Sequence, residues 1–507
     1  MSGNGAGIAT TVPAWSGQTD GSVAIVGGGI GGLASACYLA EAGADVTVFE
    51  RNEQLGGRAS TLARDGFRFD MGPSWYLMPD VYERFFGDLG ETVDDHYGLT
   101  RLDPHYRIFW KDGDRLDVLP DPAANEAAIE RYEPGAGAAL DRYLADAERQ
   151  YRIGMRHFVY EDRRRLRDYV DLDVLRHARG VSLLGSMQEH VASYVDHPKL
   201  QQLFQYSLVF LGGAPSKTPA LYSLMSHVDF NLGVHYPDGG FGTVVDAIAD
   251  VGAARGVEYV TDAPVERIAR RNGELTLRTA HGDTFGADAV VSNADYAHTE
   301  TELLAPARRQ YDDAYWQRRT WAPSAFLLYL GVEGAVEPLA HHSLVLPTDW
   351  KPHFEAIFDR PAWPRDPAYY VCVPSRTDET VAPDGHAALF VLVPVAPGLA
   401  DGEATREAFR DRVLADLARS TGVDLHDRIV FERRFCVRDF AERYNSRGGT
   451  ALGLAHTLGQ TALFRPNRVS RACPGLYYTG ADTTPGIGVP MCLISGRHTA
   501  SAICNGA

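Results

Sequence analysis

The stretch Ser22–Arg58 reads SVAIVGGGIGGLASACYLAEAGADVTVFERNEQLGGR, and the fold class follows from its pattern. Ser22–Val26 is a short apolar run that predicts a buried parallel strand. Leu33–Ala42 has the composition of a helix, and Val46–Phe49 is a second apolar run. The order strand, helix, strand predicts one βαβ unit of an α/β fold with a parallel sheet.

The turn between the first strand and the helix carries glycines in the G-x-G-x-x-G spacing, at Gly27, Gly29 and Gly32. The first glycine permits a tight turn, the second lets the backbone approach a pyrophosphate, and the third lets helix and strand pack closely. The free N–H groups at the helix N-terminus favour phosphate. Glu50 closes the second strand, where its carboxylate can accept hydrogen bonds from a ribose diol. The unit predicts a dinucleotide site and leaves both NAD and FAD open.

The uncharged segment Gly21–Ala40 is also long enough to span a bilayer. Glycines crowd its middle, however, and polar Ser and Tyr residues lie in its second half. We therefore favour the βαβ unit over a membrane span.

The composition indicates a globular, acidic protein. The chain has 507 residues, 45% of them hydrophobic, which is enough for two or more domains. Its 66 acidic and 49 basic residues give a net charge of −17, and only four of the basic residues are lysines. An acidic, lysine-poor surface suits a high-salt cytoplasm, although a GC-rich genome that favours Arg and Asp codons would produce the same composition. The charge argues against nucleic acid as a partner.

The six cysteines form no C-x-x-C pair and are too sparse for a disulfide scaffold, so we expect a reduced, intracellular protein. No H-E-x-x-H helix and no G-x-S-x-G hydrolase motif occur, and we expect no metal site. Residues 1–20 are small and polar, without the basic start or apolar core of a signal peptide. They are expected to form a disordered tail.

The middle of the chain predicts a second region with a sheet of its own. Tyr106–Trp110 and Arg115–Leu119 flank Asp112-Gly113 and predict a hairpin. Further strands are expected at Ser324–Leu330, Ser343–Leu346, Tyr369–Val373 and Ala388–Val393. The uncharged run Leu200–Leu211 and the nearly apolar run Tyr222–Leu232 fit core helices best. A greasy cavity or a membrane-facing surface stays open for both.

The C-terminal segment Leu476–Ala502 predicts a second nucleotide-binding edge. A strand ends at Gly480-Ala481-Asp482, a Gly/Pro-rich turn follows, and a helix of small residues completes the segment. The N-terminus of that helix is a further place for a phosphate or a flavin. The two nucleotide-binding segments together are more specific than either one alone.

Seven segments, spread over nearly the whole chain beyond residue 20, form a recognisable set. They are VAIVGGGIGGL (23–33), ERNEQLGGRAS (50–60), GFRFDMGPS (66–74), VVSNADYAHT (290–299), LAHHSLVL (339–346), FRPNR (464–468) and YYTGADTTPGIGVP (477–490). The set resembles the flavin-dependent amine oxidase superfamily. Within it, the match is to the bacterial and archaeal phytoene desaturase type of carotenoid desaturase.

The resemblance implies an α/β protein with a Rossmann-like FAD-binding domain built from discontinuous segments and a mixed sheet-plus-helices substrate domain. Residues 21–100, 235–300 and 430–507 would form the first domain, and 101–234 and 301–429 the second, membrane-facing one. The cofactor would be FAD. The resemblance implies that Gly27, Gly29 and Gly32 hold the pyrophosphate, that Glu50 binds the adenosine ribose, and that the Val265 backbone meets the adenine. Gly57 and Arg58 would lie along the ribityl and phosphate side, and Asp482 would bind the ribityl or phosphate portion. The backbone of Val489, Pro490 and Met491 would face the isoalloxazine.

The activity that the resemblance implies is introduction of trans double bonds into a C40 polyene by hydride transfer to FAD, with phytoene towards lycopene as the first expectation. Oxygen or a quinone would take the electrons, and the greasy substrate implies a cytoplasmic protein bound peripherally to a membrane. No acid–base residue is identified. Asp439, Tyr444, His341 and His342 are candidates only because they lie in or near matching segments, and core or surface roles are favoured for each.

Other activities stay open. A carotenoid 3,4-desaturase, a carotene isomerase or a reductase could carry the same flavin motifs. A flavin amine oxidase would place a lysine near the flavin, but Trp321–Gly331 has none, although Lys217 could enter the substrate site. A non-enzymatic prenyl-protein carrier of the same fold is disfavoured by the complete Gly56-Gly57-Arg58 and Gly480–Asp482 motifs.

Overall fold

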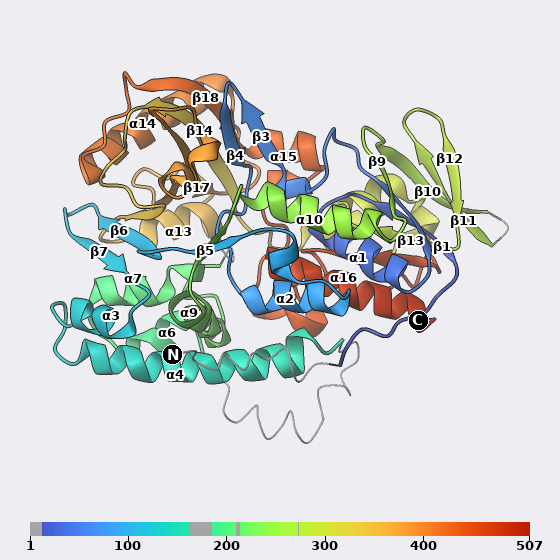
Figure 1. Ribbon diagram of the computed structural model, residues 1–507, viewed down its shortest axis with the longest axis horizontal. Helices are drawn as coiled ribbons and strands as arrows, with labels where there is room; N and C mark the ends of the chain where they lie inside the picture. Colours follow the sequence, from blue (N-terminus) through green and yellow to red (C-terminus); the bar gives the residue numbers. More distant parts are fainter. Residues whose placement is uncertain (1–12, 163–184, 209–212, 272, 507) are drawn as a thin grey trace.

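A computed structural model describes residues 13–162, 185–208, 213–271 and 273–506. Two sheet-and-helix regions lie side by side (Figure 1). Helices α1, α10 and α16 lie in the region on the right of the view, and strands β14, β17 and β18 with helix α14 lie at the upper left. The long helix α4 (Ala136–Gly154) runs along the lower edge. The α/β fold class predicted from the sequence is confirmed.

The region on the right is built on a five-stranded parallel sheet with the order β19-β13-β1-β2-β9. Its strands are β1 (Ser22–Val26), β2 (Asp45–Phe49), β9 (Glu258–Val260), β13 (Ala289–Ser292) and β19 (Leu476–Tyr478). Helix α1 (Ile30–Glu41) contacts both α10 (Phe241–Ala253) and α16 (Val489–Cys504). The segment Gly21–Ala40 is therefore a strand, a turn and a buried helix. No helix in the described part of the chain is long and apolar enough to cross a membrane.

Smaller sheets and helices complete this region. An antiparallel sheet of β10 (Val265–Arg271), β11 (Glu274–Thr279) and β12 (Thr284–Ala287) lies at the far right in Figure 1. Two further strand pairs are β3 (Thr61–Arg64) with β4 (Phe67–Asp70), and β5 (Leu99–Arg101) with β8 (His235–Pro237). The helices α2 (Pro79–Asp88), α11 (Tyr296–His298) and α12 (Asp313–Gln317) also lie in the described chain.

The region on the left is built on a seven-stranded mixed sheet with the order β18-β14-β17-β16-β15-β6-β7. Its strands are β6 (Tyr106–Trp110), β7 (Arg115–Val118), β14 (Ser324–Glu333), β15 (His342–Leu346), β16 (Tyr369–Cys372), β17 (His386–Val395) and β18 (Ile429–Phe435). Apolar residues of α14 (Glu403–Thr421) pack on one face. The opposite face packs against α4 and against α3 (Pro122–Ile129), α6 (Met187–Ala192) and α7 (Pro198–Gln205). Helices α13 (Lys351–Phe358) and α15 (Val437–Tyr444) complete the region.

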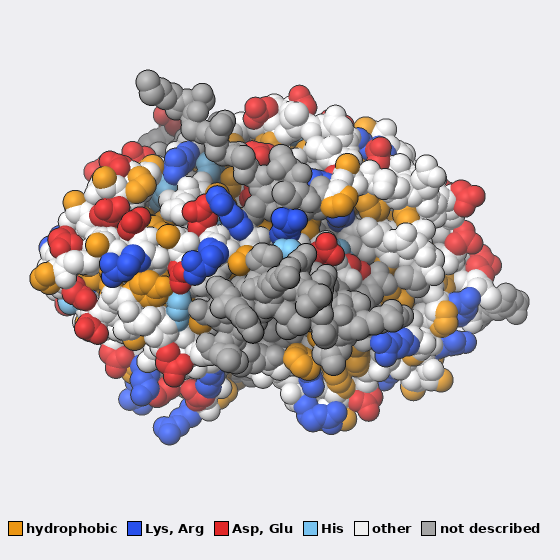
Figure 2. Space-filling model, turned by 90° about the horizontal axis from the view of Figure 1, so that it is seen from below, with side chains coloured by type: hydrophobic (Ala, Val, Ile, Leu, Met, Phe, Trp, Pro, Cys, Tyr) orange, Lys and Arg blue, Asp and Glu red, His pale blue; other side chains and the backbone are white. Residues whose placement is uncertain are grey.

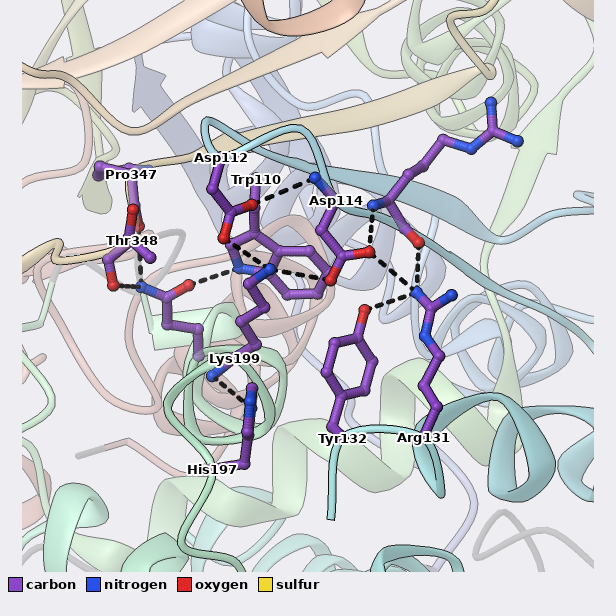
Figure 3. A network of polar contacts seen from close by, with 11 residues as sticks. Trp110, Asp112, Asp114, Arg131, Tyr132, His197, Lys199, Pro347 and Thr348 are labelled. Carbon is purple, nitrogen blue, oxygen red and sulfur yellow. Dashed lines mark hydrogen bonds and ion pairs between the residues drawn. The ribbon is translucent and has the colours of Figure 1, made fainter.

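The predicted β6–β7 hairpin is present, and polar contacts fix it to α7 (Figure 3). The ammonium group of Lys199 lies 2.8 Å from a carboxylate oxygen of Asp112 and 2.9 Å from one of Asp114. The indole N–H of Trp110 donates to the side-chain oxygen of Gln202 at 2.7 Å, and this pair is buried. The hairpin and α7 thus form one rigid wall on this side of the molecule.

Two places differ from the expected division of the chain, and one expected core segment is confirmed where it is described. Strand β18 pairs with β14, so residues 429–435 lie in the seven-stranded sheet, although the expected boundary at 430 divides them. Of the expected tail 1–20, residues 13–20 are described, and Trp15 packs on Tyr38 with ring centroids 4.9 Å apart. Of the apolar run 200–211, residues 209–211 lie outside the described residues, and Leu200, Leu203 and Phe204 are buried core residues of α7.

Candidate functional site

One cavity of about 1210 Å³ connects the two regions. Its nucleotide limb is lined by residues of the glycine-containing segments 26–31, 49–59 and 478–492 and of the segment 293–296. Its apolar limb is lined mainly by large hydrophobic side chains, among them Trp75, Leu77, Met155, Tyr206, Leu221, Tyr222, Leu224, Met225, Leu327 and Leu392. A cavity of this form offers a dinucleotide site that opens directly onto space for a greasy ligand.

The fingerprint glycines are required by close backbone contacts. Gly27 has a φ of +99°, and a Cβ atom there would lie 3.1 Å from the Ala294 nitrogen. A Cβ on Gly32 would lie only 2.2 Å from the backbone oxygen of Gly27, and one on Gly29 would lie 2.8 Å from the side-chain nitrogen Nδ2 of Asn293. Gly27 and Gly29 line the cavity, whereas Gly32 sits under the turn and allows the close packing of helix and strand.

Glu50 follows β2 and is buried in the cavity wall. Its carboxylate accepts the Gly28 N–H at 2.7 Å and the Asn52 N–H at 2.8 Å. Its backbone oxygen accepts the Ala263 N–H, which brings the start of β10 at Val265 to the same part of the cavity. The structure therefore brings Glu50 and Val265 together at the outer end of the fingerprint.

Arg58 and Gly57 form the next part of the wall, in a 3₁₀ turn that follows Gly56 (φ +100°). The Arg58 guanidinium donates to the Ser446 hydroxyl at 2.8 Å and lies 5.8 Å from the centroid of the Tyr444 ring. Its Nε–H is buried and has no hydrogen-bond partner among the described residues. A buried, unpaired guanidinium N–H beside a glycine cradle fits an anionic ligand such as a diphosphate.

The C-terminal segment closes the nucleotide limb. Helix α16 begins at Val489 after Gly488, whose φ is +123°, and the first turn Val489–Met491 lines the cavity. The N–H groups of this first turn have no partner within the helix, so they favour negative charge on a ligand. Asp482 lines the cavity and accepts the Leu454 N–H at 2.9 Å.

Two arginines of the FRPNR segment brace this closing loop from behind. The buried guanidinium of Arg465 donates to the backbone oxygens of Gln460, Leu454, Ala481 and Thr483. Arg468 donates to the Thr484 oxygen at 2.7 Å and pairs with Asp162. The sequence marked FRPNR as a matching segment but gave neither arginine a role, because an arginine that binds mainly backbone oxygens leaves no pattern of residue types.

Asp295 is a second site residue that the sequence analysis missed. It lies in the VVSNADYAHT segment, lines the cavity, and accepts the His298 N–H at 3.0 Å and the Arg447 N–H at 3.3 Å. Burial raises the pKa of its carboxyl to about 7, and the nearby charge of Asp482 adds to this shift. Two acids thus lie close together in the wall of the nucleotide limb.

The apolar run Tyr222–Leu232 is divided between the two expected roles. Val228 and Phe230 are core residues, whereas Tyr222, Leu224 and Met225 line the apolar limb. The prediction of plain core helices was therefore wrong for one face of this segment. Alternation between a core face and a cavity face leaves no sequence pattern of its own, because both faces are hydrophobic.

The acid–base candidates of the sequence analysis have structural roles. Asp439 accepts the Cys436 N–H at 2.8 Å and pairs with Arg406 at 2.6 Å. His341 and His342 are buried and do not line the cavity, although with Cys372 they form a compact cluster. Of the four candidates only Tyr444 lines the cavity.

None of the four lysines lines the cavity. Lys217, the one lysine that the sequence left open for the substrate site, pairs with Asp359 at the surface. Lys111 pairs with Asp366 and Asp416, and Lys199 is held in the β6–β7 network. The arrangement thus lacks the lysine that a flavin amine oxidase was expected to place near its flavin.

Comparison with known proteins agrees with this geometry. The flavin containing amine oxidoreductase family matches residues 30–504. A carotenoid 3,4-desaturase of Haloarcula japonica is 65% identical over 95% of this chain and 97% of its own. A zeta-carotene-forming phytoene desaturase of Myxococcus xanthus is 34% identical, covering 94% and 92% of the two chains. A 4,4'-diapophytoene desaturase of Staphylococcus aureus is 31% identical, covering 94% and 97%.

Solved structures share the fold at low sequence identity. An oxidoreductase from Methanosarcina mazei superposes with a TM-score of 0.60 at 18% identity, over 94% of this chain and 98% of its own. Putrescine oxidase bound to putrescine gives a TM-score of 0.62 at 16% identity, over 96% and 99%. The chain belongs to the flavin-containing amine oxidoreductase family, with FAD as its cofactor, and it is an FAD-dependent oxidoreductase related to the carotenoid desaturases.

Proposed function

We propose that this protein is a carotenoid 3,4-desaturase. The observation that carries the proposal is the 65% identity to the Haloarcula japonica 3,4-desaturase over nearly the full length of both chains. The phytoene and diapophytoene desaturases reach only 34% and 31%. The first expectation, phytoene towards lycopene, therefore gives way to its stated alternative.

We propose the following places for FAD along the nucleotide limb. Gly27 and Gly29 hold the pyrophosphate against the N-terminus of α1, with Gly32 beneath them, and the Arg58 Nε–H donates to a phosphate oxygen. Glu50 accepts from the adenosine ribose, and the backbone at Val265 meets the adenine. Gly57 and Asp482 lie along the ribityl portion, and the first turn of α16 (Val489, Pro490, Met491) faces the isoalloxazine.

The chemistry divides between the cofactor and the chain. Bound FAD supplies a two-electron acceptor that takes a hydride from an allylic CH₂ group of the polyene. The apolar limb binds the hydrocarbon, orients its saturated bond towards the flavin, and excludes water. The N-terminus of α16 stabilises negative charge at the position where the reduced ring would carry it.

Two further parts of the proposal concern partners. Oxygen or a quinone accepts the electrons, and the polyene enters from a membrane to which the protein binds peripherally. Support comes from the contrast between an insoluble substrate and a described chain without a spanning helix. On the face seen in Figure 2, basic and acidic side chains are interspersed, so the coloured part of that face offers no continuous basic field for anionic lipid. Flotation with neutral and with anionic liposomes tests this: protein that floats with neither overturns the membrane part.

The decisive test is expression in two bacterial hosts, one accumulating lycopene and one accumulating phytoene. Extension of the lycopene chromophore, with two hydrogens lost per new double bond by mass spectrometry, supports the 3,4-desaturase. Coloured products from phytoene would restore the first expectation instead. Unchanged pigments in both hosts, with flavin present in the purified protein, would overturn both activities.

A further inference from the structure

One carboxyl group in the wall of the apolar limb has no cationic side chain acting on it among the described residues. Asp229 lies in a π-helical turn at His227–Leu232, and its side chain is buried and lines the cavity. It is the one acidic residue in the run Tyr222–Leu232. Turns of π-helix are rare and often mark functional positions.

The contacts of Asp229 leave one of its two carboxylate oxygens without a hydrogen-bond partner among the described residues. Oδ2 accepts the hydroxyl of Tyr106 at 2.9 Å. Oδ1 is buried and has no hydrogen-bond partner among the described residues. The groups that act on this carboxyl are the phenols of Tyr106 on β6 and Tyr206 after α7, and Tyr143 on α4 also lies within its electrostatic reach. A buried carboxyl without a cationic partner is costly, which makes a purely structural role a poor explanation.

A chain of packing contacts connects Asp229 to the nucleotide limb. Gly72 packs so closely on the backbone of Arg58 that a Cβ there would lie 2.5 Å from the Arg58 oxygen. Three residues later, the ring centroid of Trp75 lies 5.3 Å from that of Tyr106 and 6.1 Å from that of Tyr206. These two tyrosines are the ones that contact Asp229.

Resting on the proposed desaturase function, we propose that Asp229 is the proton acceptor of the reaction. Two C–H bonds break at adjacent carbons of the polyene. One hydrogen leaves as hydride with its electron pair, for which the flavin is the oxidant. The other leaves as a proton to Oδ1 of the Asp229 carboxylate, and the electron pair of its bond forms the new C=C bond. The carboxylic acid then returns its proton to solvent before the next cycle.

The electrostatics of the site agree with this role. Burial raises the pKa of Asp229 to about 7, and the hydrogen bonds from Tyr206 and Tyr106 oppose the rise. A carboxyl of that pKa is partly ionised at neutral pH and is a stronger base than an exposed aspartate.

The test compares Asp229→Asn with Asp80→Asn in the FAD-loaded protein. Asp80 is a matched control, because it also accepts a tyrosine hydroxyl, that of Tyr151 at 3.1 Å, but does not line the cavity. We expect Asp229→Asn to lower the desaturation rate about 100-fold with unchanged flavin content and unchanged polyene binding, measured by tryptophan quenching. Asp80→Asn is expected to keep the wild-type rate.

An independent readout uses the protein without substrate. In difference infrared spectra, the protonated carboxyl signal that titrates near neutral pH should lose one component in Asp229→Asn and a different component, that of Asp295, in Asp295→Asn. Tyr106→Phe removes a donor to the Asp229 carboxylate and should move both the titration of the Asp229 component and the rising limb of the rate profile to higher pH.

The proposal is overturned if Asp229→Asn retains the wild-type rate, or if Asp229→Asn loses no component of the infrared signal while the wild type is active. A wild type that desaturates no polyene would overturn the proposed function instead. The infrared titration would then still report whether this carboxyl exchanges a proton near neutral pH.

Discussion

The nucleotide limb and the apolar limb share one cavity but are encoded in different ways. In the proposed FAD site the nucleotide limb binds through backbone N–H groups, and the turn that presents them has little room for side chains, so Gly27, Gly29 and Gly32 mark it in a short segment. The apolar limb is made of side chains that need only be large and hydrophobic, and they come from many elements. The difference teaches that the cofactor can be read from motifs, whereas the substrate must be read from the assembled cavity.

The largest effect is expected at the brace of the closing loop. Arg465→Met leaves four backbone oxygens without their donor, so the unfolding free energy should fall by about 4 kcal/mol or more. Denaturant unfolding of the FAD-loaded protein measures it. The control is Arg419→Met, whose side chain is 71% exposed and should matter by no more than about 1 kcal/mol. An equal decrease in the unfolding free energy of the two variants would mean that the four hydrogen bonds of Arg465 stabilise the protein no more than an exposed arginine does.

The next largest effect is a loss of FAD binding without a loss of folding. Gly29→Val places side-chain atoms against Asn293 and into the cradle, and FAD affinity should fall by about 3 kcal/mol, yielding colourless protein. Flavin absorbance per protein is the measurement. Gly87→Val on the exposed side of α2 meets no neighbour within 4 Å and should stay yellow. A yellow Gly29→Val protein with full affinity would remove the fingerprint as the FAD site.

A smaller loss is expected at the ribose end. Glu50→Gln replaces a charged acceptor that already binds the Gly28 and Asn52 N–H groups, so FAD binding should weaken by about 1–3 kcal/mol. Titration of the apoprotein with FAD, followed by flavin fluorescence, gives the value. Glu41→Gln, at the opposite end of α1, should leave the affinity as it is.

A substitution in the apolar limb should change binding of the polyene and leave binding of FAD unchanged. Met225→Trp fills part of that limb, so KM for the polyene should rise about tenfold, or about 1.4 kcal/mol, while FAD content stays unchanged. Leu224→Met conserves volume and should change KM little. If Met225→Trp instead released the flavin, the two limbs would not be separable.

A pH dependence of stability is expected from Asp295. The pKa of Asp295 is raised in the folded protein, so the native state holds a proton that the unfolded chain releases, and this contribution to stability is lost as pH rises from about 4 to about 7. The stability difference between wild type and Asp295→Asn should decline across that window. A difference that stays flat would mean that Asp295 is ionised throughout.

What the sequence reveals depends on how far apart the interacting residues are. The unit Ser22–Phe49 was predicted because its strand, turn and helix are consecutive. The partner of β18 was not, because strand pairing is a contact between distant residues. Arg465 was missed for another reason: its acceptors are backbone oxygens, which any residue type can supply. The sequence does show Asp229 as the single acidic residue of an apolar run, but only the structure shows that this residue lines the cavity.

The strand order of the five-stranded sheet also has a consequence for biosynthesis. The ribosome produces β1 and β2 first, β9 and β13 much later, and β19 with the first turn of α16 after nearly all the rest. Chains begin to fold from their N-terminal end during synthesis, yet this cradle lacks one of its walls until Val489–Met491 have emerged. With FAD in the proposed site, its capture is therefore a late step of folding, and the incomplete site has to be kept from misassembly until then.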